Sequence, residues 1–385
     1  MFGGLGRLTS VAREHRTLDG SIDTLTRSAH NLLACVPIFT IDSDAVKRLL
    51  TSDKLRQVKL QTTDVFETMR DDLRRVEARV ERAADVEYPI VSKLVRDLVQ
   101  AGGKRLRPLV LLLCGRAYRY DLEKLVTAAA GVELLHTASL VHDDTVDRAA
   151  LRRGKPTLNS VLSSGAVILV GDYLFAQSAM LAAATESPRV VAVFAATLAD
   201  ICDGQLREMF DAHRLDQSRE DYERRIYGKT ASLFAGAAEM GAILGDAPES
   251  DVAALRSYGG DLGMAFQIVD DVLDLREGTM HLGKPAGQDL KQGTVTLPTM
   301  LYAAGLDPDS DAADRLRAVI GGNLEDQADV DRVVRDIRAS GSLKVATAAA
   351  ETFAELAKAR LSVVEDAETR GLLEEVADLV WERSA

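Results

Sequence analysis

The sequence has few aromatic residues, prolines and cysteines. Aromatic side chains make up 5% of the 385 residues, with one tryptophan, nine prolines and three cysteines. The cysteines, Cys35, Cys114 and Cys202, lie far apart and have no metal-binding spacing. This pattern excludes a disulfide framework and favours buried thiols in a reducing compartment, so we expect a cytoplasmic protein. The scarcity of proline and the abundance of alanine and leucine favour helices.

Positive charge is also in deficit. The chain carries 47 Lys and Arg residues against 59 Asp and Glu residues, which gives a formal net charge of −12 at pH 7. A general binder of nucleic acids or anionic membranes needs net or clustered positive charge, so we expect neither partner. Hydrophobic residues make up 46% of the chain, which excludes disorder over most of it. The longest apolar stretches, such as residues 31–41 and 109–113, are too short or too interrupted, and we expect no membrane span.

The pattern divides the chain into an extension and one large helical domain. Residues 1–60 have weak helical periodicity and no recognisable chemistry, so they form either helices packed on the main body or a segment for docking or regulation. Over residues 61–385 apolar residues recur at spacings of three and four, as in Val65, Met69 and Leu73. No strand-like alternation extends over several segments, which predicts an all-α domain. Helices are expected over residues 89–100, 109–117, 131–147, 160–184, 190–212, 219–244, 251–275 and 295–304.

Two aspartate-rich motifs of the form DDxxD carry the clearest chemistry. The first extends from Asp143 to Asp147 and the second from Asp270 to Asp274. On a helix, the first and last aspartates of each motif lie about one turn apart on one face. Such like charges repel each other, and a cation between them relieves the repulsion. Ligand sets made only of oxygen suit a hard ion such as Mg²⁺, which keeps several waters and is commonly completed by substrate phosphates.

A solvated acidic helix face would also explain a single motif of this kind. Here there are two, and each follows an apolar helical run, residues 134–141 before the first and residues 265–269 before the second. Acidic groups at the ends of such helices are expected at the mouth of a cavity. The pattern therefore favours a metal-binding site over a solvated acidic surface.

Basic loops accompany the acidic motifs. Residues 102–108, with the sequence GGKRLRP, combine two glycines with three cations at a helix junction. Such a loop suits a polyanion, because the arginine fork matches phosphate oxygens and lysine adds a point charge. Residues 152–155, with the sequence RRGK, follow the first acidic motif, and Lys229 and Lys284 add further cations. Each cation alone is explained as an ordinary exposed residue, whereas the combination is what a diphosphate bridged by Mg²⁺ requires.

These segments, in this order, closely resemble the trans-isoprenyl diphosphate synthases, the polyprenyl synthetase family. The resemblance extends from about residue 63 to the carboxyl end and leaves the first 60 residues outside it. It rests on residues 102–108, 133–147, 151–157, 171–174, 227–230, 266–274 and 283–285. One departure follows the second motif, where the family often has a Gly-Lys pair shortly before a threonine. This chain has Thr294 at the position of that lysine and so departs from the family's set of phosphate donors.

The resemblance implies a single large helical bundle of the isoprenoid synthase type around a central apolar cavity, usually in a homodimer. It also implies that the two motifs hold Mg²⁺ on an allylic diphosphate, with Asp143, Asp147 and Asp270 as the direct ligands. The other motif aspartates, which then act as supporting or water-mediated partners, are Asp144, Asp271 and Asp274.

The resemblance further assigns residues to two substrates, an allylic diphosphate and isopentenyl diphosphate. Residues that match the allylic site and face the forming carbocation are Arg152, Lys229, Thr230, Gln267 and Lys284. Residues that match the isopentenyl site are Lys104, Arg107, His136 and Arg153. A single histidine on a helix is more often a core or surface residue, but the place of His136 in the motif favours the binding role. The residues expected to act in catalysis itself are Asp143, Asp147, Asp270, Lys229 and Arg152.

The length of the product is predicted from the residues that precede the first motif. Ala138 and Ser139 lie about one turn below Asp143 and are small, and Leu135 lies a second turn down. Gly131 lies a third turn down and is expected to leave room for a growing chain. In the family a bulky aromatic at the first of these levels stops growth early. The resemblance therefore implies a product longer than fifteen carbons.

The sequence thus predicts a Mg²⁺-dependent prenyltransferase that condenses the two substrates, head to tail, to a medium- or long-chain trans-polyprenyl diphosphate. The alternative product is the twenty-carbon geranylgeranyl diphosphate. A class I terpene cyclase also carries aspartate-rich motifs, but it does not need the isopentenyl site found here. A non-catalytic subunit of a heteromeric synthase is expected to lose aspartates that are intact in this chain. Homomeric and heteromeric assembly both stay open.

Overall fold

The computed structural model describes residues 64–85, 87–100, 103–147, 149, 151–152, 155–276, 286–324 and 326–382. All of them belong to one unit of the chain, Thr63–Ala385. The extension predicted over residues 1–60 lies outside the described residues, so its boundary with the enzyme domain stays a prediction.

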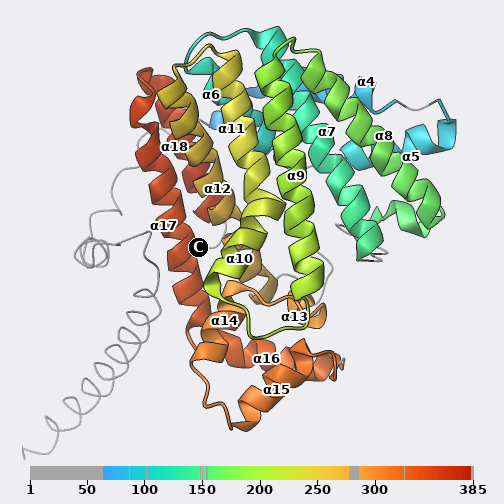
Figure 1. The fold of residues 1–385 in the computed structure, drawn as a ribbon, viewed down its shortest axis with the longest axis vertical. Coiled ribbons are helices and arrows are strands. Elements are labelled where there is room, and N and C mark those ends of the chain that lie inside the picture. Colours follow the sequence, from blue (N-terminus) through green and yellow to red (C-terminus); the bar gives the residue numbers. More distant parts are fainter. Residues whose placement is uncertain are drawn as a thin grey trace, which may run out of the picture. The chain divides into compact units, whose positions relative to one another are not determined.

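The described unit is all-α, as predicted (Figure 1). Its first half contains α3 (Val65–Thr68), α4 (Arg70–Ala83), α5 (Pro89–Gln100), α6 (Leu106–Arg116), α7 (Leu122–Val146), α8 (Ser164–Ala183) and α9 (Pro188–Asp211). The second half contains α10 (Arg219–Ile226), the π-helical turn η3 (Tyr227–Ala231), α11 (Ser232–Leu244), α12 (Glu249–Leu275), α13 (Gln288–Lys291), α14 (Leu297–Ala304), α15 (Asp311–Ile320), α16 (Gln327–Ala339), α17 (Ser342–Arg360) and α18 (Ala367–Trp381). Two-residue strands, β1 (Leu151–Arg152) and β2 (Lys155–Pro156), form an antiparallel hairpin after the first aspartate motif.

The centre of the bundle is formed by α6, α7, α11 and α12, which are buried over most of their lengths. Among the described helices, α11 packs against α6, α9 and α12. In addition, α7 packs on α8, and α12 packs on α17. Apolar residues surround α6, α7 and α11 instead of forming one stripe, which is typical of helices covered on all sides. Both aspartate motifs lie at the carboxyl ends of these buried helices, as the sequence predicted.

The clearest differences between predicted and observed helices concern three predictions. The helix expected from residue 131 begins nine residues earlier, at Leu122. The helix expected over residues 219–244 is three elements, because the π-helical turn separates α10 from α11 while leaving the apolar pattern unbroken. Single π-helical turns inside α-helices occur frequently at functional sites. The helix expected from residue 109 begins earlier, at Leu106. Pro108 is tolerated within its first turn, where a backbone N–H has no partner inside the helix.

A smaller lobe follows the second motif. It contains α13, α15 and α16 and has its own hydrophobic cluster around Leu316 and Val333. The loop between α9 and α10 is attached to this lobe, because the His213 backbone N–H donates to the Gly293 carbonyl at 2.9 Å and the His213 ring nitrogen lies 2.8 Å from the Ile320 carbonyl. The lobe therefore connects the end of α9 with the segment after the second motif.

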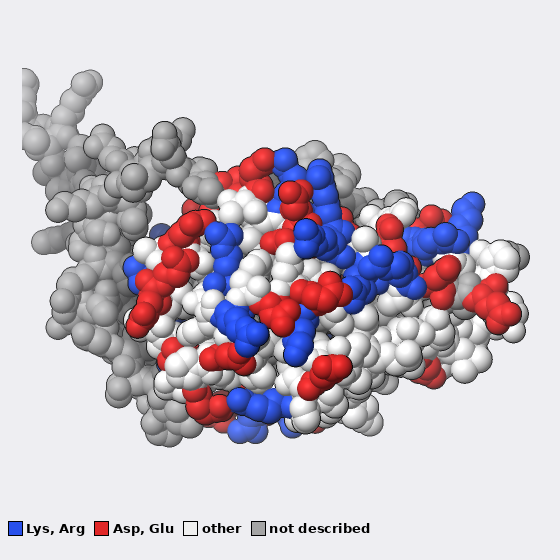
Figure 2. All heavy atoms as spheres, turned by 90° about the horizontal axis from the view of Figure 1, so that it is seen from above, with Lys and Arg blue, Asp and Glu red and all other residues white. Residues whose placement is uncertain are grey.

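The end of the bundle opposite the smaller lobe, where α9 and α12 begin, displays charges of both signs (Figure 2). Ion pairs join its loops and helix ends. They include Arg116 with Glu368 at 2.7 Å, Arg119 with Asp246 at 3.0 Å, and Arg189 with Glu249 at 2.7 Å.

Two described helices, α7 and α8, are long and apolar enough to cross a membrane by length and composition alone. The most apolar window of α7 is 78% buried in the fold, whereas that of α8 is 33% buried. The sequence analysis passed over both helices because it considered only uninterrupted apolar runs. The burial of α7 is typical of a core helix, whereas most of the apolar window of α8 is exposed in this chain.

Candidate active site

The first aspartate motif occupies the last turn of α7. Asp143 lies in that turn and Asp147 caps it, with the Asp147 backbone N–H donating to the Asp143 carbonyl at 2.8 Å. The carboxyl end of a helix bears partial negative charge, and two carboxylates placed there also repel each other. A bound cation would relieve both effects. Burial raises the pKa of Asp143 to about 6, Lys229 opposes the rise, and Glu208 adds to it. A bound cation would favour the ionised form of this carboxyl.

The second motif occupies the last turns of α12, and two of its aspartates are held by protein groups. Asp271 is buried and accepts hydrogen bonds from the Tyr222 hydroxyl at 2.7 Å and from the Gln267 amide at 2.8 Å. Asp274 accepts the backbone N–H groups of Gln288 and Asp289, each at 3.2 Å. The hydrogen bonds of Asp271 and Asp274 therefore join the carboxyl end of α12 to α10 and to the start of α13.

Asp144, in the first motif, has a comparable supporting contact. The Arg152 Nε atom donates to both of its carboxylate oxygens, at 2.8 and 3.0 Å. This pair attaches the β1–β2 hairpin to the end of α7 and places the Arg152 guanidinium beside the motif. The predicted division into direct ligands and supporting aspartates stays a prediction.

The two motifs meet around Lys229, on the π-helical turn. Lys229 forms an ion pair with Glu208 of α9. Burial favours the neutral form of Lys229, but Glu208 and Asp143 raise its pKa, so the ammonium form is retained. Asp289 interacts electrostatically with Asp274 and with Lys229 and so belongs to the same charged group. The structure thus brings the ends of α7, α9 and α12 and the start of α13 to one place.

Two glycines make this convergence sterically feasible. A Cβ atom on Gly204 of α9 would lie 2.1 Å from the Lys229 backbone nitrogen, and a Cβ on Gly228 would lie 2.8 Å from the Asp200 carbonyl oxygen. The backbones of α9 and the π-helical turn are therefore in direct contact. That contact lets Glu208 reach Lys229.

Sequence analysis missed Glu208 and Asp289. Neither belongs to a DDxxD motif, and each is a single acidic residue with no periodic partner of the same kind. Burial raises the pKa of Asp289 well above its ordinary value, and Asp274 contributes to the rise. Such strongly perturbed groups are typical of functional sites, but burial becomes visible only in the fold.

The basic loop before α6 contains cations with different roles. The Arg105 guanidinium forms ion pairs with Glu133 and with Glu77 and donates to the Val99 carbonyl, so this arginine is structural. Lys104 is exposed. The Arg107 guanidinium instead lies within the fold, above the rings of two phenylalanines.

Arg107 is the basic residue most clearly arranged to receive an anion. Its guanidinium carbon lies 4.4 Å from the centre of the Phe234 ring and 5.8 Å from that of Phe266. Its Nε atom is buried and has no hydrogen-bond partner in the protein. Burial lowers the pKa of Arg107 to about 10, while Glu133 and Asp270 oppose the change. Asp270 therefore connects the Arg107 environment electrostatically with the second motif.

Other predicted site residues fall into three groups. Thr230 and Gln267 are joined by a hydrogen bond of 2.7 Å, from the threonine hydroxyl to the amide oxygen. His136 is half-buried on α7, two turns before Asp143. Predicted site residues that lie outside the described part of the chain are Arg153 and Lys284.

The predicted floor of the elongation path is only partly as expected. Leu135 and Ala138 are buried, and Ser139 is half-buried with its hydroxyl donating to the His136 carbonyl at 2.8 Å. The prediction that Gly131 leaves room for a growing chain is wrong. A Cβ there would lie 3.2 Å from the Ser178 carbonyl oxygen and 3.3 Å from the Leu181 Cβ, because α8 packs directly on this glycine.

The donor set fits a hard divalent cation. Within the ranges that the structure describes, no three His, Cys, Asp or Glu side chains are grouped closely enough to hold a metal on their own. Carboxylates at the ends of α7 and α12 are the donors present, and Mg²⁺ commonly binds through one or two carboxylates, waters and substrate phosphates.

Comparison with known proteins agrees with this site. A model of the polyprenyl synthetase family matches residues 88–337. The chain is 40% identical over 321 residues to heptaprenyl diphosphate synthase component 2 of Geobacillus stearothermophilus, an alignment that covers 83% of this chain and 98% of that protein.

Solved structures show the same fold. A decaprenyl diphosphate synthase from Rhodobacter capsulatus superposes with a TM-score of 0.78 at 35% identity, covering 83% of this chain and 98% of that one. A polyprenyl synthase from Caulobacter crescentus CB15, complexed with calcium and isoprenyl diphosphate, gives a TM-score of 0.79 at 35% identity and covers 83% and 97%.

Proposed function

Because this chain belongs to the polyprenyl synthetase family, we propose that it uses Mg²⁺ to condense an allylic diphosphate with isopentenyl diphosphate. It is a trans-prenyltransferase, a polyprenyl diphosphate synthase of the medium- to long-chain kind. The observation that carries the proposal is the convergence of both aspartate motifs, Lys229 and the buried guanidinium of Arg107.

We assign the site residues as the sequence predicted. The metal is held by Asp143, Asp147 and Asp270. The allylic diphosphate contacts Arg152, Lys229, Thr230, Gln267 and Lys284, and isopentenyl diphosphate contacts Lys104, Arg107, His136 and Arg153. The ion pairs of Lys229 with Glu208 and of Arg152 with Asp144 hold both cations in place before substrate arrives. This is preorganisation of charge at the leaving group.

The proposed reaction breaks the bond between the allylic carbon and its diphosphate oxygen. The double bond of isopentenyl diphosphate supplies the electron pair for the new carbon–carbon bond, and the resulting cation loses a proton to the released diphosphate. The divalent ion, when bound, neutralises charge on the departing diphosphate. Arg107 holds the second diphosphate with charge-assisted hydrogen bonds, and Phe234 and Phe266 exclude water on its inner side.

We propose a product longer than twenty carbons. Ala138 is small and fully buried beneath the first motif, so α7 itself supplies no aromatic floor at that level. The alternative is geranylgeranyl diphosphate, which a floor supplied by another helix would give. A class I cyclase does not need the site around Arg107, whose unpartnered Nε favours a second diphosphate.

We further propose that the enzyme is a homodimer joined through α8 and α9. Both helices expose apolar side chains at helical spacing: Ile168, Leu169 and Met180 on α8, and Leu206, Met209 and Phe210 on α9. Leu169 is 69% exposed and Phe210 is 78% exposed. Contiguous apolar surface of this kind marks an interaction site, and α8 and α9 pack against each other. A second copy would cover the apolar window of α8.

We also propose a cytoplasmic location. Among the described residues Cys114 and Cys202 are both free thiols, which suits a reducing compartment.

The reaction is tested by incubating the purified chain with Mg²⁺, farnesyl diphosphate and labelled isopentenyl diphosphate. The proposal expects extractable prenyl diphosphates longer than twenty carbons. A twenty-carbon product would favour the alternative synthase. A hydrocarbon formed without isopentenyl label would identify a cyclase. Activity that requires a second protein would contradict the homomeric proposal.

The dimer is tested by sedimentation of the wild type and of the Leu169→Glu/Leu206→Glu variant. The variant should sediment as a monomer. Val345→Glu is the matched control, because Val345 is 42% exposed on α17, outside the proposed interface. A wild-type monomer, or a dimer unaffected by the double substitution, would contradict the assignment.

A further inference from the structure

A buried chain of hydrogen bonds extends from α10 to the residues assigned to the allylic site. The Tyr222 hydroxyl donates to Asp271 Oδ2 at 2.7 Å, and Gln267 Nε2 donates to Asp271 Oδ1 at 2.8 Å. The Thr230 hydroxyl then donates to Gln267 Oε1 at 2.7 Å. Tyr222 is completely buried and Asp271 is 3% exposed. The four side chains come from α10, the π-helical turn and α12.

We propose that Tyr222 is a positioning residue for the prenyl transfer, acting through Asp271 and Gln267 on Thr230. This inference rests on the proposed function. Tyr222 does not belong to either aspartate motif and contacts neither substrate in our assignment. Its role is to fix which end of the Gln267 amide faces the threonine.

The direction of each hydrogen bond follows from the groups involved. In the observed geometry both Asp271 oxygens accept hydrogen bonds, as the two oxygens of a carboxylate do. Tyr222 supplies one donor, and the other must be the NH₂ group of Gln267. The amide carbonyl of Gln267 therefore faces Thr230, which has to donate its single hydroxyl proton to it.

This direction determines what Thr230 presents to the reacting carbon. With its proton committed to Gln267, the threonine oxygen offers lone pairs, and lone pairs stabilise developing positive charge. With the Gln267 amide reversed, Thr230 would accept from the NH₂ group and point its own proton toward the allylic cation. A fixed dipole of the correct sign lowers the barrier without reorganising during the reaction.

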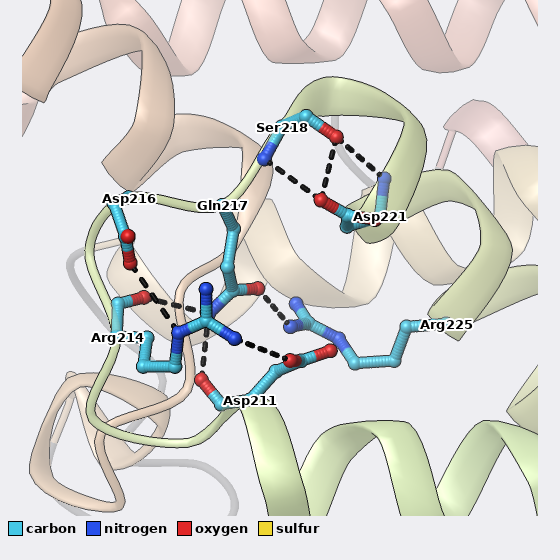
Figure 3. A network of polar contacts seen from close by, with 7 residues as sticks. All are labelled: Asp211, Arg214, Asp216, Gln217, Ser218, Asp221 and Arg225. Carbon is cyan, nitrogen blue, oxygen red and sulfur yellow. Dashed lines mark hydrogen bonds and ion pairs between the residues drawn. The ribbon is translucent and has the colours of Figure 1, made fainter.

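The tyrosine is itself held rigidly. The Arg225 guanidinium is 2% exposed and lies 5.6 Å from the centre of the Tyr222 ring. Arg225 donates to the Gln217 side-chain oxygen at 2.7 Å and to the Val295 carbonyl at 2.5 Å. Figure 3 shows Gln217 reaching Arg225 from the loop between α9 and α10. The ring therefore has a packed cation on one side and cannot turn its hydroxyl away from Asp271.

The test compares two tyrosines that lose the same group. Tyr222→Phe removes the hydroxyl that donates to Asp271. Tyr258→Phe is the matched control, because Tyr258 is also completely buried and its hydroxyl donates to the Leu373 carbonyl at 2.8 Å, on another side of α12. Both substitutions remove one buried hydrogen bond, so both lower the melting temperature. Single-turnover condensation is measured with saturating Mg²⁺, farnesyl diphosphate and labelled isopentenyl diphosphate.

The expected result separates the two variants in rate. Tyr222→Phe should lower the rate constant about 10- to 100-fold, the loss of one hydrogen bond to a charged group, with the KM of each substrate changed less than about threefold. It should also increase the fraction of allylic substrate released as prenyl alcohol, formed when water adds to the cation and loses a proton. Tyr258→Phe should keep the wild-type rate. Equal rates in the two variants would overturn the inference.

A double-substitution cycle tests whether Tyr222 acts through Asp271. The Tyr222→Phe/Asp271→Asn variant should be no slower than Asp271→Asn alone, because the hydroxyl then has no carboxylate to orient. Additive losses would overturn the proposed route. A wild-type chain that forms no prenyl product would contradict the proposed function, whereas an active wild type with a neutral Tyr222→Phe would contradict only this inference.

Discussion

At the scale of single residues, aspartates of the same motif have different surroundings. Asp143 is largely buried beside Lys229, while Asp144 is paired with Arg152 and Asp271 with Tyr222. Asp144 and Asp271 are thus held by protein groups. The DDxxD spacing alone does not show these differences in surroundings.

The raised pKa of Asp143 predicts a pH-dependent cost in the absence of metal. Because burial raises its pKa from 3.8 to about 6, the folded protein binds a proton that the unfolded chain releases between these values. The carboxyl therefore destabilises the fold increasingly as pH rises from about 4 to 7, by up to about 3 kcal/mol. Asp143→Asn should raise the free energy of unfolding at pH 8 and have little effect at pH 4. Urea titrations of the metal-free protein measure the free energy of unfolding. A difference between Asp143→Asn and the wild type that is the same at pH 4 and pH 8 would contradict the prediction.

Arg107 is predicted to act on one substrate. Arg107→Ala should raise the KM for isopentenyl diphosphate by one to two decades, because a hydrogen bond to a charged group contributes roughly 1.5–3 kcal/mol. The KM for the allylic substrate should change much less. Arg116→Ala is the control, since this arginine pairs with Glu368 at the other end of α6. Equal weakening of both substrates would show that Arg107 is structural.

Residue spacing and the family resemblance predicted several residues that the structure brings together, and the limits of that prediction have physical causes. The aspartate pairs follow from helical periodicity, and Lys229, Thr230 and Gln267 follow from the family resemblance. Glu208 and Asp289 were missed because their proximity to Lys229 depends on contacts between distant elements. Arg105 resembled its neighbours in sequence, but its backbone conformation, with φ of 53°, turns it toward Glu133.

At the scale of elements, the contact between α9 and the π-helical turn organises the site. Gly204→Ala should separate the two backbones, because the added Cβ would lie 2.1 Å from the Lys229 nitrogen. We expect a lower melting temperature and loss of most activity. Gly165→Ala is the matched control, since nothing lies within 4 Å of a Cβ on this helical glycine, and it should stabilise α8 by up to about 1 kcal/mol. Similar behaviour of the two variants would contradict the role of the contact.

The direction of chain growth is also a property of an element, α7. Ala138→Phe should place an aromatic ring about one turn below Asp143 and shorten the product to about fifteen or twenty carbons without stopping condensation. Chromatography of the labelled products measures the change. Val345→Phe, at an exposed position on α17 outside the proposed interface, should leave product length unchanged. If Ala138→Phe gave the wild-type distribution, the chain would not grow along this face of α7.

Element boundaries were predicted least well where local and tertiary preferences compete. The apolar pattern over residues 219–244 continues through the π-helical turn, so periodicity alone gave one helix. The open space expected at Gly131 was wrong because a missing side chain indicates close packing as readily as a cavity, and here α8 fills it.

At the scale of the whole molecule, composition and periodicity predicted an all-α domain, and the fold confirms it. Composition and periodicity did not indicate that the most hydrophobic window of α8 is only 33% buried. The proposed homodimer would cover this exposed window, and contact with a second copy cannot be read from the pattern of one helix. The small lobe around α15 and α16 was likewise invisible as a separate cluster.

The central claim is that both aspartate motifs hold the metal for one prenyl transfer. The most direct test is the rate of Mg²⁺-dependent incorporation of labelled isopentenyl diphosphate by Asp143→Ala, Asp270→Ala and the control Asp71→Ala, whose side chain is 86% exposed on α4. The account predicts that both motif variants lose turnover with unchanged helix content, and that the control keeps the wild-type rate. Near-normal turnover in either motif variant would contradict it.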